Sequence, residues 1–115
     1  MRDFHIEREQ RGAIYLLRLA GAVDMYSYAR LDEQVRQLFS QNHHRIILDC
    51  QNLDYIGSAG LGSLVGLAKE ARVHGGDVRL LRVPERIYKI IELLGFTKVL
   101  QVFHDETEAL NSFAS

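Results

Sequence analysis

The sequence DCQNLDYIGSAGLG occupies residues 49–62 and joins two segments with different hydrophobic patterns. Its first two residues close the run RIILDC (45–50), which is short and almost continuously apolar, as is typical of a central strand covered on both faces. Beyond Ser58, apolar residues recur at the helical spacing i, i+3, i+4 and i+7, at Leu61, Leu64, Val65 and Ala68. The stretch therefore predicts a buried strand, a turn, and a helix that starts near Ser58.

Ser58 is surrounded by three glycines at this predicted helix start, Gly57, Gly60 and Gly62. Glycine inside a helix costs roughly 1 kcal/mol relative to alanine, so we expect the backbone here to approach another group closely. The first N–H groups of a helix have no partner within the helix, and they favour an anion. An added negative charge on Ser58 would therefore be stabilised locally.

The segments on either side of this stretch predict further strands and helices. Alternating residues at 4–9 and 13–19 predict a β-hairpin. Helices are predicted from the candidate N-cap Ser27 to Ser40, from Ser58 to the pair Gly75-Gly76, and from Pro84 to Gly95. Strands are predicted at 78–82 and 99–103, and the capping-box sequence DETE (105–108) precedes a short C-terminal helix.

The order of these elements, ββαβαβαβα, implies right-handed crossovers and parallel neighbouring strands after the hairpin. We therefore expect one α/β domain over residues 1–115, with a mixed four- to five-stranded sheet, an N-terminal β-hairpin and about four helices. A chain of 115 residues is long enough for one hydrophobic core.

Composition excludes several classes of function. The formal net charge is −1, which gives no electrostatic reason to bind nucleic acid or an anionic membrane. No apolar run approaches the ~20 residues of a membrane span, and the N-terminus does not resemble a signal peptide. The single cysteine, Cys50, cannot form an intramolecular disulfide, which suits a reducing compartment. We expect a cytoplasmic protein that does not insert into membranes.

The glycine-rich helix start does not match two well-known catalytic or cofactor-binding motifs. In a dinucleotide-binding fingerprint, Gly66 would be one position late, and Arg79–Arg82 stands where an acidic residue is expected. A nucleophile elbow needs glycine where the chain has Ile56. We therefore expect no cofactor and no enzymatic activity.

The histidines do not suggest a metal site. His43 and His44 are adjacent, and none of His5, His74 and His104 has a partner one helical turn away. We expect all five to be solvated surface residues and expect no bound metal.

Two interpretations of Ser58 remain open from the residues alone. Serine is a frequent helix N-cap, and a simple cap would explain its position. A serine at a helix N-terminus is also a good place to add a phosphate, which would put about two negative charges on a surface that a partner must desolvate.

In combination and order, these motifs resemble the STAS domain (sulphate transporter and anti-sigma factor antagonist), specifically a stand-alone bacterial anti-sigma factor antagonist. The resemblance covers essentially the whole chain. Residues 21–24 (GAVD) correspond to a Gly-Glu-Leu-Asp element, residues 53–62 to the phosphorylation loop, and residues 83–100 to the third helix and its exit.

The resemblance implies roles for individual residues. Ser58 aligns with the phosphorylated serine, and Asp24 with an aspartate that helps to engage the partner. The implied partner-binding residues are Asp24, Tyr55, Gly57, Ser58, Ala59, Gly60, Leu61 and Gly62. Two positions depart from the common pattern, because Gly57 replaces an acidic residue or serine and Ala22 replaces glutamate.

The implied partners are a serine kinase of the histidine-kinase-like ATPase superfamily, which is also the anti-sigma factor, and a serine phosphatase. The unphosphorylated antagonist would bind the kinase and release a sigma factor, and phosphorylation of Ser58 would end this binding. The alternative is a STAS scaffold or adaptor subunit without a phosphorylation switch, as in stressosome-like or lipid-transport assemblies.

Overall fold

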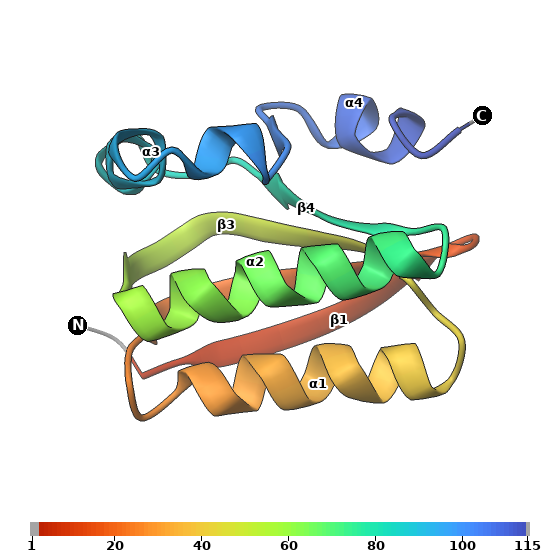
Figure 1. Ribbon diagram of the computed structural model, residues 1–115, viewed down its shortest axis with the longest axis horizontal. Helices are drawn as coiled ribbons and strands as arrows, with labels where there is room; N and C mark the ends of the chain where they lie inside the picture. Colours follow the sequence, from red (N-terminus) through yellow and green to blue (C-terminus); the bar gives the residue numbers. More distant parts are fainter. Residues whose placement is uncertain (1–2, 115) are drawn as a thin grey trace.

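A five-stranded mixed sheet with strand order β1-β2-β3-β4-β5 lies at the centre of the fold (Figure 1). It is seen in a computed structural model that describes residues 3–114. The strands are β1 (His5–Arg11), β2 (Ile14–Val23), β3 (Arg45–Ile56), β4 (Asp77–Leu81) and β5 (Val102–Phe103). The helices in this range are α1 (Tyr28–Ser40), α2 (Ser58–Val73), α3 (Glu85–Leu93) and α4 (Glu106–Asn111), with a 3₁₀ turn at Phe96–Lys98.

The strand directions follow from the connections. β1 and β2 form the predicted antiparallel hairpin, whose turn contains Gly12 at a φ of 61°, a conformation that glycine adopts readily. The pairs β2–β3, β3–β4 and β4–β5 are parallel, as helical crossovers require. The predicted α/β fold with a mixed sheet is therefore confirmed.

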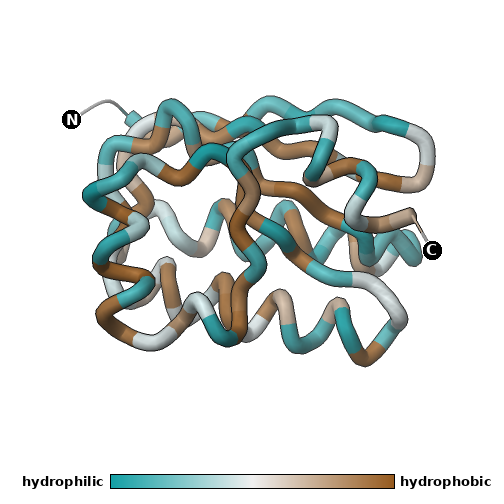
Figure 2. Tube along the Cα trace, turned by 90° about the horizontal axis from the view of Figure 1, so that it is seen from above, coloured by the Kyte–Doolittle hydropathy of each residue, from teal (hydrophilic) through white to brown (hydrophobic). Residues whose placement is uncertain are grey.

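The sheet has apolar side chains on both faces. One face packs against α1, α2 and α3, with residues such as Leu48, Leu64 and Ile87 in a single cluster. A smaller cluster on the other face joins strand residues such as Leu16 to Ala109 and Phe113 at the C-terminal end. Figure 1 shows α1 and α2 side by side, and Figure 2 shows hydrophobic residues concentrated along the central strands.

Strand β3 is longer than predicted, because it runs to Ile56 rather than ending at Cys50. Its register with β2 shifts twice, between Arg18 and Ala20 and between Gly21 and Ala22, and each shift gives β3 one extra residue. These two bulges keep Leu53 and Ile56 in the core cluster with Cys50. Because of the same irregularity, apolar residues do not alternate strictly after Cys50, and the sequence pattern does not predict this part of the strand.

Two predicted element ends need correction. Ser27 precedes α1 but does not cap it with its side chain; its hydroxyl instead donates to the carbonyl of Ala22 at 2.7 Å. The last strand is only two residues long, because Val99 and Leu100 still belong to the turn and donate their N–H groups to the carbonyl of Phe96, at 3.0 and 2.8 Å. The predicted cap at Asp105 is confirmed, since its carboxylate accepts the Glu108 N–H at 3.1 Å.

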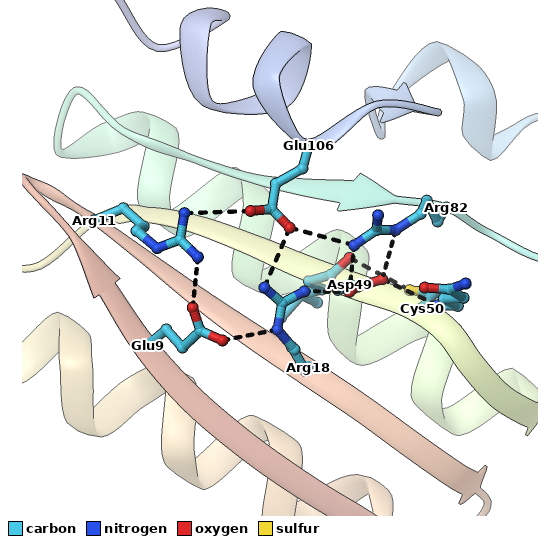
Figure 3. Close-up of polar contacts among 9 residues, drawn as sticks. Glu9, Arg11, Arg18, Asp49, Cys50, Arg82 and Glu106 are labelled. Atoms are coloured by element: carbon cyan, nitrogen blue, oxygen red, sulfur yellow. Dashed lines mark hydrogen bonds and ion pairs between the residues drawn. The ribbon is translucent and has the colours of Figure 1, made fainter.

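A network of ion pairs connects the sheet to α4 (Figure 3). The carboxylate of Asp49 on β3 lies 2.7 Å from an Arg18 nitrogen and 2.9 Å from an Arg82 nitrogen. Both arginines also contact Glu106 at the start of α4, at 3.2 and 3.3 Å. Burial would raise the pKa of Asp49, but hydrogen bonds from Arg82, the Gln51 N–H and Arg18 together lower it. The network thus holds α4 against the sheet with an ionised Asp49.

Candidate functional site

Ser58 is the first residue of α2, and its side chain is exposed. The N-cap position belongs to Gly57, whose N–H donates to the carbonyl of Val23 at 2.8 Å and whose carbonyl accepts the Leu61 N–H at 3.0 Å. The loop is therefore fixed to the end of β2. Within residues 3–114 the Ser58 hydroxyl has no hydrogen-bond partner, so Ser58 is not the helix cap that one interpretation suggested.

Asp24 follows the end of β2 and shapes the turn before α1. Its Oδ1 accepts the backbone N–H groups of Tyr26 and Ser27 at 2.9 and 3.0 Å. The hydrogen bond from Tyr26 is the main reason that the pKa of Asp24 lies below its usual value. Because Val23 pairs with Ile56, Asp24 and Ser58 leave the sheet at the same end. Asp24 thus presents a negative charge near Ser58 and also has a structural role.

Ser58 lies in a surface groove formed by the turn after β2 and the junction of β3 and α2. The residues that line this groove, the Ser58 groove, are Asp24, Met25, Tyr26, Tyr55, Gly57, Ser58 and Ala59. Three of its side chains are large and apolar yet exposed: Met25 at 70%, Tyr26 at 86% and Tyr55 at 44%. Apolar side chains exposed together commonly mark an interaction surface.

Met25 and Tyr26 are functional candidates that the sequence analysis missed. The available signal was an apolar pair, Met25-Tyr26, directly after the β2 end at a turn, where polar residues are more usual. The helical periodicity of α1 could not assign these two side chains to a face, because they precede the helix, which starts at Tyr28.

Two of the predicted partner-binding residues are buried instead. Leu61 is 2% exposed and belongs to the core, so its side chain cannot touch a partner while the fold is intact. Gly60 is also buried, and a Cβ there would lie 2.8 Å from Val23 Cγ1 and 2.9 Å from Ile56 Cγ1. Close packing of α2 against the sheet therefore explains why residue 60 is a glycine. Gly62 is exposed with open space around it.

The histidines are less isolated than predicted. His44 stacks on His74 with ring centroids 4.4 Å apart, and His43 contacts Tyr15 at 4.6 Å. They lie at the start of β3 and the end of α2, away from Ser58. In residues 3–114 no cluster of three histidine, cysteine or acidic side chains could hold a metal ion. Nor is any helix in this range long and apolar enough to cross a membrane.

Residues 5–109 match the STAS domain family, and the chain belongs to it. It is 24% identical over 109 residues to an anti-sigma F factor antagonist from Paenibacillus polymyxa, covering 94% of this chain and 93% of the relative. It is 25% identical over 100 residues to an anti-sigma-B factor antagonist from Staphylococcus aureus, covering 87% of this chain and 93% of that protein.

Solved structures show the same fold. An anti-sigma factor antagonist from Mycobacterium paratuberculosis matches with a TM-score of 0.88 at 16% identity, covering 98% of this chain and 96% of that one. The Bacillus cell fate determinant SpoIIAA in its phosphorylated form matches with a TM-score of 0.73 at 21% identity, over 96% of this chain and 98% of that one.

Proposed function

We propose that this protein is a cytoplasmic anti-sigma factor antagonist that is switched by phosphorylation of Ser58. In its unphosphorylated form it binds an anti-sigma factor that is also a serine kinase, and this binding frees a sigma factor. The kinase phosphorylates Ser58 and thereby ends the complex, and a serine phosphatase restores the antagonist. The observation that carries the proposal is the exposed Ser58 hydroxyl without a hydrogen-bond partner in residues 3–114, at the first position of α2 and in an apolar groove.

The position of Ser58 suits a switch that acts on binding rather than on folding. A phosphate there would meet the free N–H groups at the start of α2, which stabilise negative charge. The same phosphate would add about two negative charges beside Asp24, on a surface that the partner has to desolvate. Repulsion and desolvation together would cost several kcal/mol of binding free energy, by analogy with unpaired charge in an interface.

The relatives support this proposal. Two of them carry the names anti-sigma F and anti-sigma-B factor antagonist. SpoIIAA has been solved in unphosphorylated and phosphorylated forms, and this chain matches both with a TM-score of 0.73. Such a likeness to both forms agrees with a switch in which the fold is retained.

The test is phosphorylation by a serine kinase of the proposed superfamily from the same organism, followed by intact-mass spectrometry. The wild type should gain one phosphate, and Ser58→Ala should gain none. The matched control is Ser63→Ala, because Ser63 lies on the same helix but its hydroxyl donates to Asp32 at 2.9 Å. Phosphate that persists in Ser58→Ala, or disappears in Ser63→Ala, would contradict the assignment.

The same kinase serves for the binding measurement. Ser58→Ala should bind it about as well as the wild type, whereas Ser58→Asp should bind at least about tenfold more weakly, with an unchanged circular dichroism spectrum. Equal binding by the two variants would contradict the charge switch. If the two variants bind equally and the wild type gains no phosphate, the result would favour the alternative, a permanent STAS scaffold subunit. The observation that supports this alternative is the absence of a side chain at Gly57.

A further inference from the structure

We propose that Tyr55 is the specificity-determining residue of the Ser58 groove, and that it defines the surface that a kinase meets beside Ser58. This inference rests on the proposed function. It starts from the fact that Gly57 offers no side chain beside Ser58, and that the ring of Tyr55 fills the space where a side chain at position 57 would begin.

The ring of Tyr55 occupies the space next to Gly57. A Cβ built on Gly57 would lie 3.2 Å from the Tyr55 hydroxyl oxygen, 3.4 Å from Cε2 and 3.6 Å from Cζ. The first of these distances is tighter than most Cβ contacts. The backbone cannot easily move away, because the Gly57 N–H is bonded to Val23 at 2.8 Å. An alanine at position 57 would therefore require the Tyr55 ring to shift by a few tenths of an ångström.

The second bulge of β3 gives Tyr55 this orientation. Leu53 and Ile56 both point into the core, with the extra residue of the bulge between them. Tyr55 is turned outward and is 44% exposed, so a large part of its ring can contact a partner. Its phenol hydroxyl is the polar group that lies over Gly57, immediately before the residue to be phosphorylated.

The groove also indicates the chemistry of the partner. Tyr55, Met25 and Tyr26 offer exposed apolar surface, and the lowered pKa of Asp24 keeps that carboxylate ionised at neutral pH. The kinase surface that fits this groove is therefore apolar. It carries an arginine or lysine opposite Asp24 and a hydrogen-bond acceptor for the Tyr55 hydroxyl. Aromatic residues in this kind of setting often carry a large share of the binding free energy.

A double-mutant cycle tests the inference, with the dissociation constant of the kinase complex and the KM and kcat of phosphorylation as readouts. Tyr55→Ala should weaken binding and raise KM by about tenfold or more, and Tyr55→Phe should recover most of this loss because it keeps the ring. Gly57→Ala should weaken binding in the wild type, because it displaces the ring. It should have no further effect in Tyr55→Ala.

Two controls separate the possible outcomes. Tyr28→Ala removes a tyrosine that is 36% exposed but does not line the groove, and it should bind normally. Thermal unfolding should be nearly unchanged by Tyr55→Phe. A wild type that neither binds the kinase nor gains phosphate overturns the proposed function together with this inference. This inference alone is overturned if the wild type binds the kinase and Tyr55→Ala binds it equally well. It is also overturned if the effects of Tyr55→Ala and Gly57→Ala on binding are additive.

Discussion

Gly60 and Gly62 lie two positions apart in α2, yet their surroundings are opposite. A Cβ at position 60 would clash with Val23 and Ile56, whereas a Cβ at position 62 would meet nothing within 4 Å. Gly60→Ala should therefore lower the free energy of unfolding by about 1–3 kcal/mol, as overpacking does. Gly62→Ala should raise it by about 0.5–1 kcal/mol, because alanine is the better helix former. Urea unfolding monitored by circular dichroism measures both, and similar effects of the two substitutions would contradict the packing described here.

At the scale of elements, Asp49 joins β3 to α4 through Arg18 and Arg82. The Asp49 side chain is only 6% exposed, and removing its charge leaves Arg18 and Arg82 with Glu106 as the acidic side chain that they still share. Asp49→Asn should lower the free energy of unfolding by about 3 kcal/mol, the lower end for a broken buried pair, because the arginines are partly exposed. The control is Glu85→Gln, which removes an exposed pair with Lys89 at 3.5 Å and should change stability by less than about 0.5 kcal/mol. A loss for Asp49→Asn no larger than that of the control would mean that the network does not hold α4.

The start of β3 and the end of α2, at the end of the sheet away from Ser58, should respond to pH. Burial, and then the nearby His74, lowers the pKa of His44, while Glu70 acts in the opposite direction and His43 adds to the lowering. The folded state therefore favours neutral His44. Its contribution to stability is complete above the pKa of the unfolded chain, about 6.5, and is lost as the pH falls below that value.

Urea unfolding at pH 7.5 and at pH 5.5 should accordingly show lower stability at the acidic pH. His44→Gln should reduce this difference, whereas His5→Gln, at an exposed position on β1, should leave it unchanged. An undiminished difference in His44→Gln would show that other groups cause it.

At the scale of the whole molecule, unfolding should be a single cooperative transition. The two apolar clusters lie on opposite faces of the same strands, with Ile46 in one and Ile47 in the other, so neither can be lost alone. Cys50 supplies a second probe, because it is buried and burial raises its pKa to about 12. Its reaction with a thiol reagent should therefore follow the same urea dependence as circular dichroism. Thiol reactivity at lower urea would reveal partial opening around β3.

The order of elements was predictable, because hydrophobic periodicity identifies each helix and most strands, including the helix that begins at Ser58. The full length of β3 was not, since its two bulges replace simple alternation between Cys50 and Ile56. The groove was predictable only in part. Tyr55 and Ser58 belong to a recognisable stretch, but their contact with the turn at Met25 depends on the pairing of β2 with β3.

The two borders of the sheet differ from its centre in a way that affects association. The border strand β1 carries the sequence HIEREQR, in which charged residues predominate, and the other border strand, β5, has only two residues. Charged or very short edge strands discourage the addition of a further strand from another chain. The sheet is therefore protected against edge-to-edge aggregation, which leaves the loops and helices as the surfaces through which the protein can recognise another molecule.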